Sequence, residues 1–212
     1  MVRKRVAVLI SGRGSNMVAL IEAAKDPSFP AEIVVVVSND PAAQGLERAA
    51  AANIPRVVVD HRRFGRDREA FERALQDVLA RYETQLICLA GFMRLLTSWF
   101  VRQWEGRMLN IHPALLPAFK GLDTHARAIQ AGAKTHGATV HYVVPEMDAG
   151  PIIVQGAVPV LPGDTDATLA ARVLEVEHRI YPQALRLVAE GRVTVDNGRC
   201  LVDGKPTATH AP

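Results

Sequence analysis

Residues 5–24, RVAVLISGRGSNMVALIEAA, join a short aliphatic and β-branched run to a glycine-rich turn and then to an apolar helical pattern. The run Arg5–Ser11 has the composition of a buried strand, and Ser15–Ala24 continues as a helix. Strand, glycine turn and helix in direct succession are typical of the opening unit of an α/β fold with a parallel sheet.

The following segments repeat this alternation. Continuous apolar strands separated by helices indicate a mostly parallel sheet that is covered by helices on both faces. Strands are predicted at Glu32–Ser38, Arg56–Asp60, Gln85–Ala90 and Met108–His112, and helices at Gln44–Asn53 and Asp67–Tyr82.

The pattern changes from about residue 136. Two strands joined by a tight turn, a long helix with a bend at Pro182, and a hairpin turning at Asn197-Gly198 are predicted there. These segments are Gly137–Val144, Ile152–Val160, Thr165–Glu190 and Arg192–Val202. The prediction is therefore one α/β domain with a mostly parallel, Rossmann-like sheet and a mixed or antiparallel C-terminal part, ending at residue 204, with 205–212 as a frayed tail.

Composition limits the possible functions. The chain has 212 residues, of which 49% are hydrophobic, so it can bury a substantial core. The net charge of +3 is small, which does not indicate nucleic-acid binding but suits an anionic small substrate. Two cysteines, Cys88 and Cys200, argue against a disulfide scaffold and fit a reducing cytoplasm. No window approaches the length of a membrane span, and the N-terminal apolar run is too short for a signal peptide.

The loop Ser11–Asn16, SGRGSN, has the arrangement of a phosphate-binding turn. Its glycines let the backbone approach an anion, and the N–H groups at the start of the following helix then face that anion. A Walker loop would need Gly-Lys-Ser/Thr, and the dinucleotide fingerprint would need a third glycine where Met17 stands. The loop favours one phosphate on a small metabolite, although a tight turn capped by Ser15 or Asn16 would explain the same residues.

A second motif, LNIHPALLP at 109–117, ends an apolar strand with an amide and an imidazole. Alternation along a strand turns Asn110 and His112 to the same side, and Pro113 stops the ladder behind them. An amide can stabilise an oxyanion and an imidazole can transfer a proton, which suits acyl chemistry. Asp148 is the carboxylate predicted to hold His112 protonated. A capped strand end and a turn aspartate bonded to its own backbone remain the structural alternatives.

Metal and covalent chemistry find little support in the sequence. The other histidines, His125, His136, His141 and His178, do not form HExxH or combine with a cysteine pair, so no metal site is predicted. No GxSxG motif is present and Cys88 falls inside a predicted strand, so no covalent nucleophile is predicted either.

The chain closely resembles the glycinamide ribonucleotide formyltransferase family, the folate-dependent transformylases of purine synthesis. The resemblance extends from about Val6 to the final hairpin. It rests on LISGRGSN, SNDPAAQGLERA, LAGFMRLL, LNIHPALLPAFKGLDTHARAIQAG, HGATVHYV, MDAGPII and EVEHRIYP. The SGRGSN loop points to the ribonucleotide branch among transferases that use 10-formyltetrahydrofolate.

The resemblance implies roles for individual residues. The backbone of Gly14, Ser15 and Asn16 would hold the ribonucleotide phosphate, and Glu177 would contact the ribonucleotide. Asn110, His112 and Asp148 match the catalytic trio. The folate would lie against Arg68, Met93, Arg94, Leu95, Leu96, Asn110 and the loop of Tyr142, Val143, Val144, Pro145, Glu146 and Met147. One departure is Leu174, which stands where some relatives have a polar residue near the phosphate.

The implied reaction is formyl transfer from 10-formyltetrahydrofolate, as co-substrate, to the amine of 5-phosphoribosylglycinamide, without a metal. The phosphate-binding half would span about 1–105 and the folate-binding, catalytic half about 106–204. The expected protein is a cytoplasmic monomer or homodimer that binds small molecules, and neither nucleic acid nor membranes.

Three other functions share parts of this pattern. A methionyl-tRNA formyltransferase would be expected to carry a further C-terminal nucleic-acid domain, for which the short tail leaves no room. A formyltetrahydrofolate hydrolase would be expected to carry an N-terminal regulatory domain, whereas the first strand here begins at about Arg5. A non-catalytic folate- or nucleotide-binding module would bind without turnover.

Overall fold

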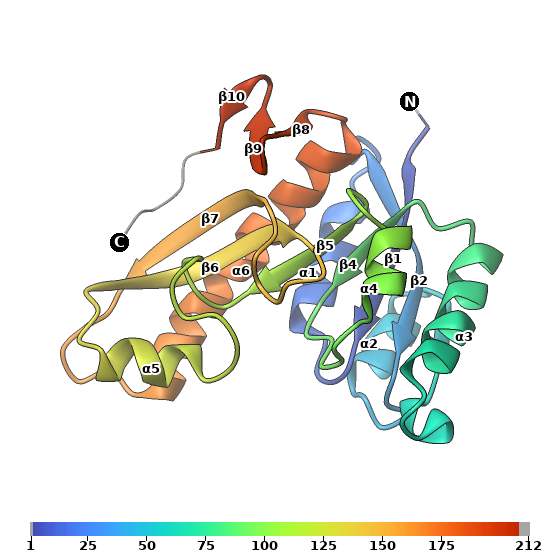
Figure 1. Cartoon of the computed structure of the whole chain (residues 1–212), viewed down its shortest axis with the longest axis horizontal. Helices are drawn as coiled ribbons and strands as arrows, with labels where there is room; N and C mark the ends of the chain where they lie inside the picture. The colour runs from blue at the N-terminus through green and yellow to red at the C-terminus, as the bar shows by residue number, and fades with distance from the viewer. Residues whose placement is uncertain (1, 208–212) are drawn as a thin grey trace. The chain divides into compact units, whose positions relative to one another are not determined.

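The computed structural model describes residues 2–207 (Figure 1). Its strands are β1 (Lys4–Ile10), β2 (Ala31–Ser38), β3 (Arg56–Val58), β4 (Leu86–Leu89), β5 (Met108–His112), β6 (Thr135–Tyr142), β7 (Ile152–Pro159), β8 (Val193–Asp196), β9 (Arg199–Val202) and β10 (Lys205–Pro206). Its helices are α1 (Ser15–Ala24), α2 (Gly45–Ala51), the short 3-10 helix η1 (His61–Phe64), α3 (Arg68–Arg81), α4 (Ser98–Gln103), α5 (Thr124–Gln130) and α6 (Asp166–Ala189).

A seven-stranded sheet has the order β3-β2-β1-β4-β5-β6-β7, and a separate three-stranded sheet has the order β10-β9-β8. The pairs β1–β2, β1–β4, β2–β3 and β4–β5 are parallel, whereas β6–β7, β8–β9 and β9–β10 are antiparallel. The predicted fold class, a mostly parallel sheet with an antiparallel C-terminal part, is therefore confirmed.

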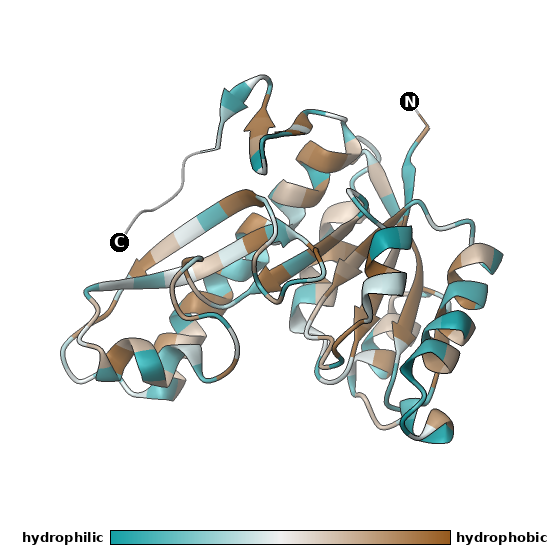
Figure 2. Cartoon of the chain, in the orientation of Figure 1, coloured by the Kyte–Doolittle hydropathy of each residue, from teal (hydrophilic) through white to brown (hydrophobic). Residues whose placement is uncertain are grey.

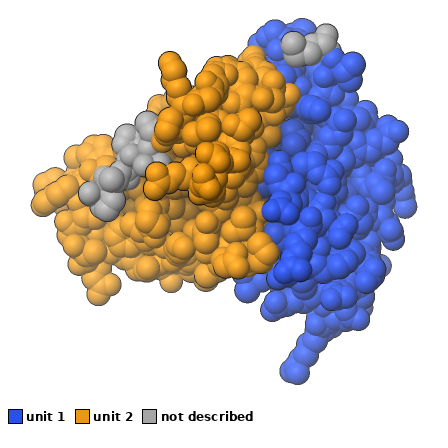
Figure 3. Space-filling model, turned by 45° about the horizontal axis from the view of Figure 1, so that its top comes forward, with its two compact units in different colours: residues 1–110 blue, residues 111–212 orange. Residues whose placement is uncertain are grey.

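The chain divides into two compact units, residues 1–110 and residues 111–212, which Figure 3 colours blue and orange. In the first unit the chain moves outward from β1 through β2 to β3 and then returns to the other side of β1, where it forms β4 and β5. Because parallel crossovers are right-handed, this reversal puts α1 and α2 on one face of the sheet and α3 and α4 on the other. The contacts agree, since α1 touches α2 and α3 touches α4.

The core of the first unit follows from this coverage. Residues 6–10 of β1 are fully buried, and the run IVVVV of β2 is buried at each position, because helices cover both faces. Most of β2 is accordingly hydrophobic in Figure 2, whereas α3 carries both hydrophobic and hydrophilic residues. The apolar stripe of α3, with Phe71, Leu75, Val78 and Leu79, is buried.

The second unit is built on the β6–β7 hairpin and the long helix α6, which contacts both strands. Gly156 of β7 makes this approach possible, because a Cβ there would lie 2.3 Å from Val176 Cγ1. The side chain of Thr165 accepts from the backbone of Thr168 and forms a capping box at the start of α6. The helix continues through Pro182 to Ala189, so the bend expected at that residue does not end it.

The structure adds elements that the sequence patterns did not indicate, namely η1, α4 and β10. Lys205 and Pro206 pair with Val202 and Leu201 of β9, so the predicted frayed tail is wrong at these two residues. Residues 208–212 of that tail lie outside the described residues. The final hairpin turns at Asn197 and Gly198, both with positive φ, as predicted. Among residues 2–207, no helix combines the length and apolarity required to cross a membrane.

Candidate active site

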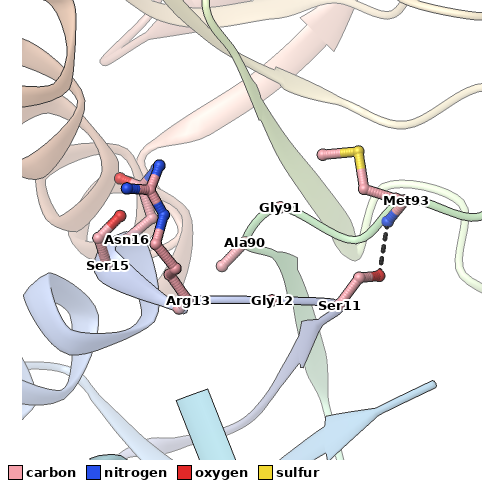
Figure 4. A pocket seen from close by; sticks show the side chains of 9 residues that line it. Ser11, Gly12, Arg13, Ser15, Asn16, Ala90, Gly91 and Met93 are labelled. Atoms are coloured by element: carbon pink, nitrogen blue, oxygen red, sulfur yellow. Dashed lines mark hydrogen bonds between the residues drawn. The ribbon is translucent and has the colours of Figure 1, made fainter. Parts of the chain in front are cut away.

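A pocket of about 260 Å³ lies where two loops of the first unit meet. The loop after β1 and the loop after β4 belong to adjacent strands whose connections leave in opposite directions. This is the topological switch point at which open α/β sheets bind ligands. The lining residues are Ser11, Gly12, Arg13, Gly14, Ser15, Asn16, Ala90, Gly91 and Met93 (Figure 4).

The backbone of the loop after β1 is shaped for an anion. Gly14 is the N-cap of α1 with φ 70° and has no side chain with which to cap the helix. Ser15 and Asn16 follow Gly14 as the first two residues of α1, so neither occupies the N-cap position of the alternative interpretation. Amides at a helix N-terminus attract negative charge, and Arg13 adds a cation to the lining.

Glycines at two places allow this loop to fold. The positive φ of Gly14 suits a residue without Cβ, and a Cβ there would lie 3.1 Å from Gly45 Cα. Gly45, at the start of α2, donates its N–H to Gly12 O at 3.0 Å, and a Cβ on Gly45 would lie 2.5 Å from Ile10 Cδ1. The loop therefore rests directly on the backbone of α2.

His112 is the last residue of β5 and is 5% exposed. Its Nε2 lies 2.9 Å from the carbonyl oxygen of Phe119, and its Nδ1 lies 3.5 Å from Asp148 Oδ2. The structure thus brings together two residues that are 36 positions apart in the sequence. Both ring nitrogens of His112 therefore face oxygen atoms that can accept a hydrogen bond.

Asp148 is held by its turn and by its neighbours. It adopts φ 51°, a left-handed conformation that aspartate tolerates, and its Oδ2 accepts the N–H of Gly121 at 2.9 Å. Gly150 lets the turn cross the end of β6, because a Cβ there would lie 1.7 Å from Tyr142 O. The motif MDAGP therefore places the carboxylate through a left-handed aspartate followed by a glycine that no larger residue can replace.

A second histidine reaches the same carboxylate. His141 Nε2 lies 3.9 Å from Asp148 Oδ1, and its Nδ1 lies 2.8 Å from Tyr142 O, which can only accept. Burial lowers the pKa of His141, and the positive charge of His112 lowers it further, against the opposing effects of Tyr142 O and Asp148. A neutral His141 with its proton on Nδ1 places no positive charge beside Asp148.

Three aromatic rings pack edge to face in the second unit. His136 is fully buried, with its ring centroid 5.7 Å from that of Phe119 and 5.3 Å from that of His125. Burial, and next the neighbouring His125, lower the pKa of His136 to about 4. The ring of His136 is therefore neutral at physiological pH and supports Phe119, whose carbonyl accepts from His112.

The remaining predicted residues are placed in their elements as follows. Asn110 is half-buried in β5, on the same side of the strand as His112 by alternation. Glu177 is buried in α6 and Leu174 is half-buried one turn before it, whereas Arg68 is exposed at the first position of α3. Of the predicted folate residues 93–96, Met93 lines the pocket, and it is followed by Arg94, Leu95 and Leu96. The loop after β6 carries half-buried Val143 and Val144 and exposed Pro145, Glu146 and Met147, next to buried Tyr142.

Ala90 and Gly91 were not predicted from the sequence as pocket residues, and His141 was not predicted as a neighbour of Asp148. The strand order would have found the first two, because it makes the loops after β1 and β4 neighbours. For metals, the described part of the chain contains no group of three or more His, Cys, Asp or Glu side chains arranged to hold an ion.

A pocket for an anion at a switch point, and a histidine held between a carboxylate and a carbonyl, define an α/β protein equipped for polar group transfer. The chain belongs to the formyl transferase family, because that family's pattern matches residues 4–185. The resemblance expected from the sequence is thus confirmed at the level of the family.

Individual relatives agree with this placement. The trifunctional purine biosynthetic protein adenosine-3 of Bos taurus is 52% identical over 198 residues, which cover 93% of this chain and 20% of that protein. The chain therefore spans about a fifth of the length of that relative. The phosphoribosylglycinamide formyltransferase of Haemophilus influenzae is 42% identical over 202 residues, with 95% of each chain covered. The structure of the phosphoribosylglycinamide formyltransferase of Coxiella burnetii matches with a TM-score of 0.91 and 46% identity, over 97% of this chain and 96% of that one.

Proposed function

We propose that the protein transfers the formyl group of 10-formyltetrahydrofolate to the primary amine of 5-phosphoribosylglycinamide, giving formylglycinamide ribonucleotide in de novo purine biosynthesis. The observation that carries this proposal is the paired geometry of His112, whose two ring nitrogens face Asp148 and the Phe119 carbonyl. The full-length similarity to a phosphoribosylglycinamide formyltransferase supports the choice of substrates.

The chemistry needs no covalent enzyme intermediate. The neutral amine attacks the formyl carbon and forms the new C–N bond, giving a tetrahedral intermediate with an oxyanion. The Asn110 amide and the cationic His112 would stabilise that oxyanion, because hydrogen-bond donors aimed at developing charge lower the barrier. Collapse breaks the bond to N10 of the folate, which gains a proton as the attacking nitrogen loses one. His112 would assist this exchange, with Asp148 stabilising its charge.

The binding roles follow the resemblance. Gly14, Ser15 and Asn16 would hold the ribonucleotide phosphate through backbone amides, with Glu177 on the ribonucleotide. The folate would lie against Met93, Arg94, Leu95, Leu96, Arg68, Asn110 and the Tyr142–Met147 loop. Met93 and Leu95 are 68% and 62% exposed, which is unusual for large apolar side chains and suits a ring system that covers them. A cytoplasmic monomer or homodimer that acts without a metal is proposed.

One assay tests the reaction. Purified protein is incubated with 10-formyltetrahydrofolate and 5-phosphoribosylglycinamide, and the release of tetrahydrofolate and the formation of formylglycinamide ribonucleotide are both measured. A parallel reaction omits the amine. The proposal expects equal amounts of both products, and neither when the amine is absent. Tetrahydrofolate release without the amine would instead indicate a hydrolase, and binding without any turnover would indicate a non-catalytic module.

A further inference from the structure

Ser11 connects the two loops that form the pocket of the first unit. Its backbone N–H donates to Gly91 O at 3.2 Å, and its hydroxyl oxygen accepts the N–H of Met93 at 2.7 Å, which Figure 4 marks with a dashed line. Ser11 is the first residue of the loop Ser11–Asn16, which is called the anion loop below. Met93 is the first residue of the segment 93–96. Both belong to the lining of the same pocket.

A hydrogen bond to Asn39 fixes the direction of the Ser11 hydroxyl. Its proton is donated to Asn39 Oδ1, an oxygen that can only accept, and Asn39 is 4% exposed. The amide nitrogen of Asn39 lies 3.1 Å from His61 Nδ1, while its amide oxygen faces the Ser11 hydroxyl. With its single proton used in this way, the hydroxyl offers a lone pair to the Met93 N–H.

The far end of the same segment has a separate anchor. Glu72 of α3 is 1% exposed, and its carboxylate accepts the N–H of Thr97 at 2.6 Å and also the Thr97 hydroxyl. A buried carboxylate with these donors holds its partner strongly. Hydrogen bonds therefore hold residues 93–96 at both ends. Ser11, the anchor at one end, belongs to the anion loop, whereas Glu72, the anchor at the other end, does not.

We infer that Ser11 is a positioning residue that couples the two substrate sites, so that the ribonucleotide phosphate on the anion loop strengthens folate binding at 93–96. This inference rests on the proposed function for the identity of the two ligands. A phosphate that orders the loop at Ser11 also orders the Met93 amide through the hydroxyl, and the folate then binds a segment that has already lost part of its freedom. By linkage, the folate strengthens ribonucleotide binding by the same factor.

Calorimetric titration measures this coupling without turnover when tetrahydrofolate, which carries no formyl group, is the folate probe. Its Kd is measured with and without saturating 5-phosphoribosylglycinamide, and the ratio of the two values is the coupling factor. For the unmodified protein we expect a factor of about five or more, the lower end of typical couplings. Ser11→Ala is expected to bring the factor to within about twofold of one, whereas Ser11→Thr, which keeps the hydroxyl, restores it.

Two matched variants separate coupling from simple loss of affinity. Ser15→Ala removes a hydroxyl of the same loop that makes no hydrogen bond to 93–96 among the described residues, and Glu72→Gln weakens only the far anchor. Either one changes Kd values, but each is expected to leave the coupling factor as in the unmodified protein. Ser11→Cys, with a weakly hydrogen-bonding thiol of similar size, replaces Ser11→Ala if thermal unfolding shows that the alanine variant is not folded.

The outcomes distinguish the inference from the proposed function. A coupling factor near one in the unmodified protein, or one that survives in Ser11→Ala or in the Ser11→Cys variant that replaces it, overturns the role of Ser11. Failure of the unmodified protein to bind either ligand overturns the proposed function itself.

Discussion

The anion loop of the first unit and the His112 centre of the second unit, which comprises His112, Asp148 and the Phe119 carbonyl, are built in different ways. The first consists mainly of backbone groups and the second mainly of side chains. The loop presents helix-terminal amides and glycines, and its features come from backbone conformation at Gly14 and from contact with Gly45. The His112 centre consists of side chains, with an imidazole between a carboxylate and a carbonyl. Backbone amides do not titrate, so the first region should bind its ligand over a wide pH range. The second region depends on protons and on the identity of each side chain.

The largest expected effect comes from the His112 centre. His112→Ala removes the proposed oxyanion donor, and kcat should fall by about 10²–10³, which corresponds to roughly 3–4 kcal/mol of barrier. Asp148→Asn keeps the size of the side chain but loses the negative charge, and a fall in kcat in the same direction is expected. Steady-state kinetics with both substrates measure these changes.

The control for these variants is substrate binding and thermal unfolding. If the two regions work by different means, both variants should still bind 5-phosphoribosylglycinamide with nearly unchanged Kd. Turnover close to that of the unmodified protein in both variants would rule out the proposed catalytic centre.

The second prediction concerns pH and the second unit. The pKa of His136 falls from 6.5 to about 4 on folding, chiefly through burial, so the unfolded chain binds more protons between these values. Stability is therefore complete above about pH 6.5 and declines as the pH falls toward 4, by on the order of 3 kcal/mol from this group. Urea unfolding at pH 7.5 and pH 5 measures the change.

A matched variant identifies the group responsible. His136→Gln should reduce the loss between pH 7.5 and pH 5, while a residual slope remains, because burial also lowers the pKa values of His125, His141 and His178. An unchanged slope in the variant would assign the effect to other groups. Protonation of His136 at low pH should disturb its ring contact with Phe119, whose carbonyl faces His112. Activity is therefore expected to fall together with stability at low pH.

The fold could be predicted from the sequence wherever a local pattern decides the element. The limits of α1 and β5 agree with the prediction at both ends, because a glycine turn precedes α1 and a proline follows β5. Other elements depend on distant partners. β10 has two residues and forms only because β9 offers an edge. Glu72 falls on a charged position of a helix, and it is buried because Thr97, 25 residues away, supplies its donors.

The candidate site also has one part that a local sequence pattern predicts and another part that depends on distant residues. The anion loop is readable because its glycines and helix are consecutive in the sequence. Asp148 could be named from its turn as the candidate carboxylate, but no local pattern places it beside His112, since the two residues lie far apart in the sequence. His141 lies near Asp148 because the turn at Gly150 reverses the chain against Tyr142, and this relation becomes visible only in the structure.

A smaller effect is expected at the glycines of the anion loop. Gly14→Ala forces a residue with a Cβ into φ 70°, against Gly45 Cα at 3.1 Å, and should destabilise the protein by about 1–2 kcal/mol while raising the KM for the ribonucleotide. Gly12→Ala is the matched control, because a Cβ there meets no atom of the described structure within 4 Å. Urea unfolding of both variants checks this, and equal stabilities would contradict the role given to the Gly14 conformation.

The smallest effect tests whether the anion loop binds through its backbone. Ser15→Ala removes the hydroxyl at the first position of α1 but keeps the amide, so the KM for 5-phosphoribosylglycinamide should rise by less than about threefold. A hydroxyl that bonded directly to the phosphate would contribute about 1.5–3 kcal/mol, a change of tenfold or more. KM values for 5-phosphoribosylglycinamide from steady-state kinetics at pH 6.5 and pH 8.5 distinguish a backbone site from a site that uses the Ser15 hydroxyl. A tenfold change would make the loop a side-chain site like the His112 centre and would end the contrast between the two regions.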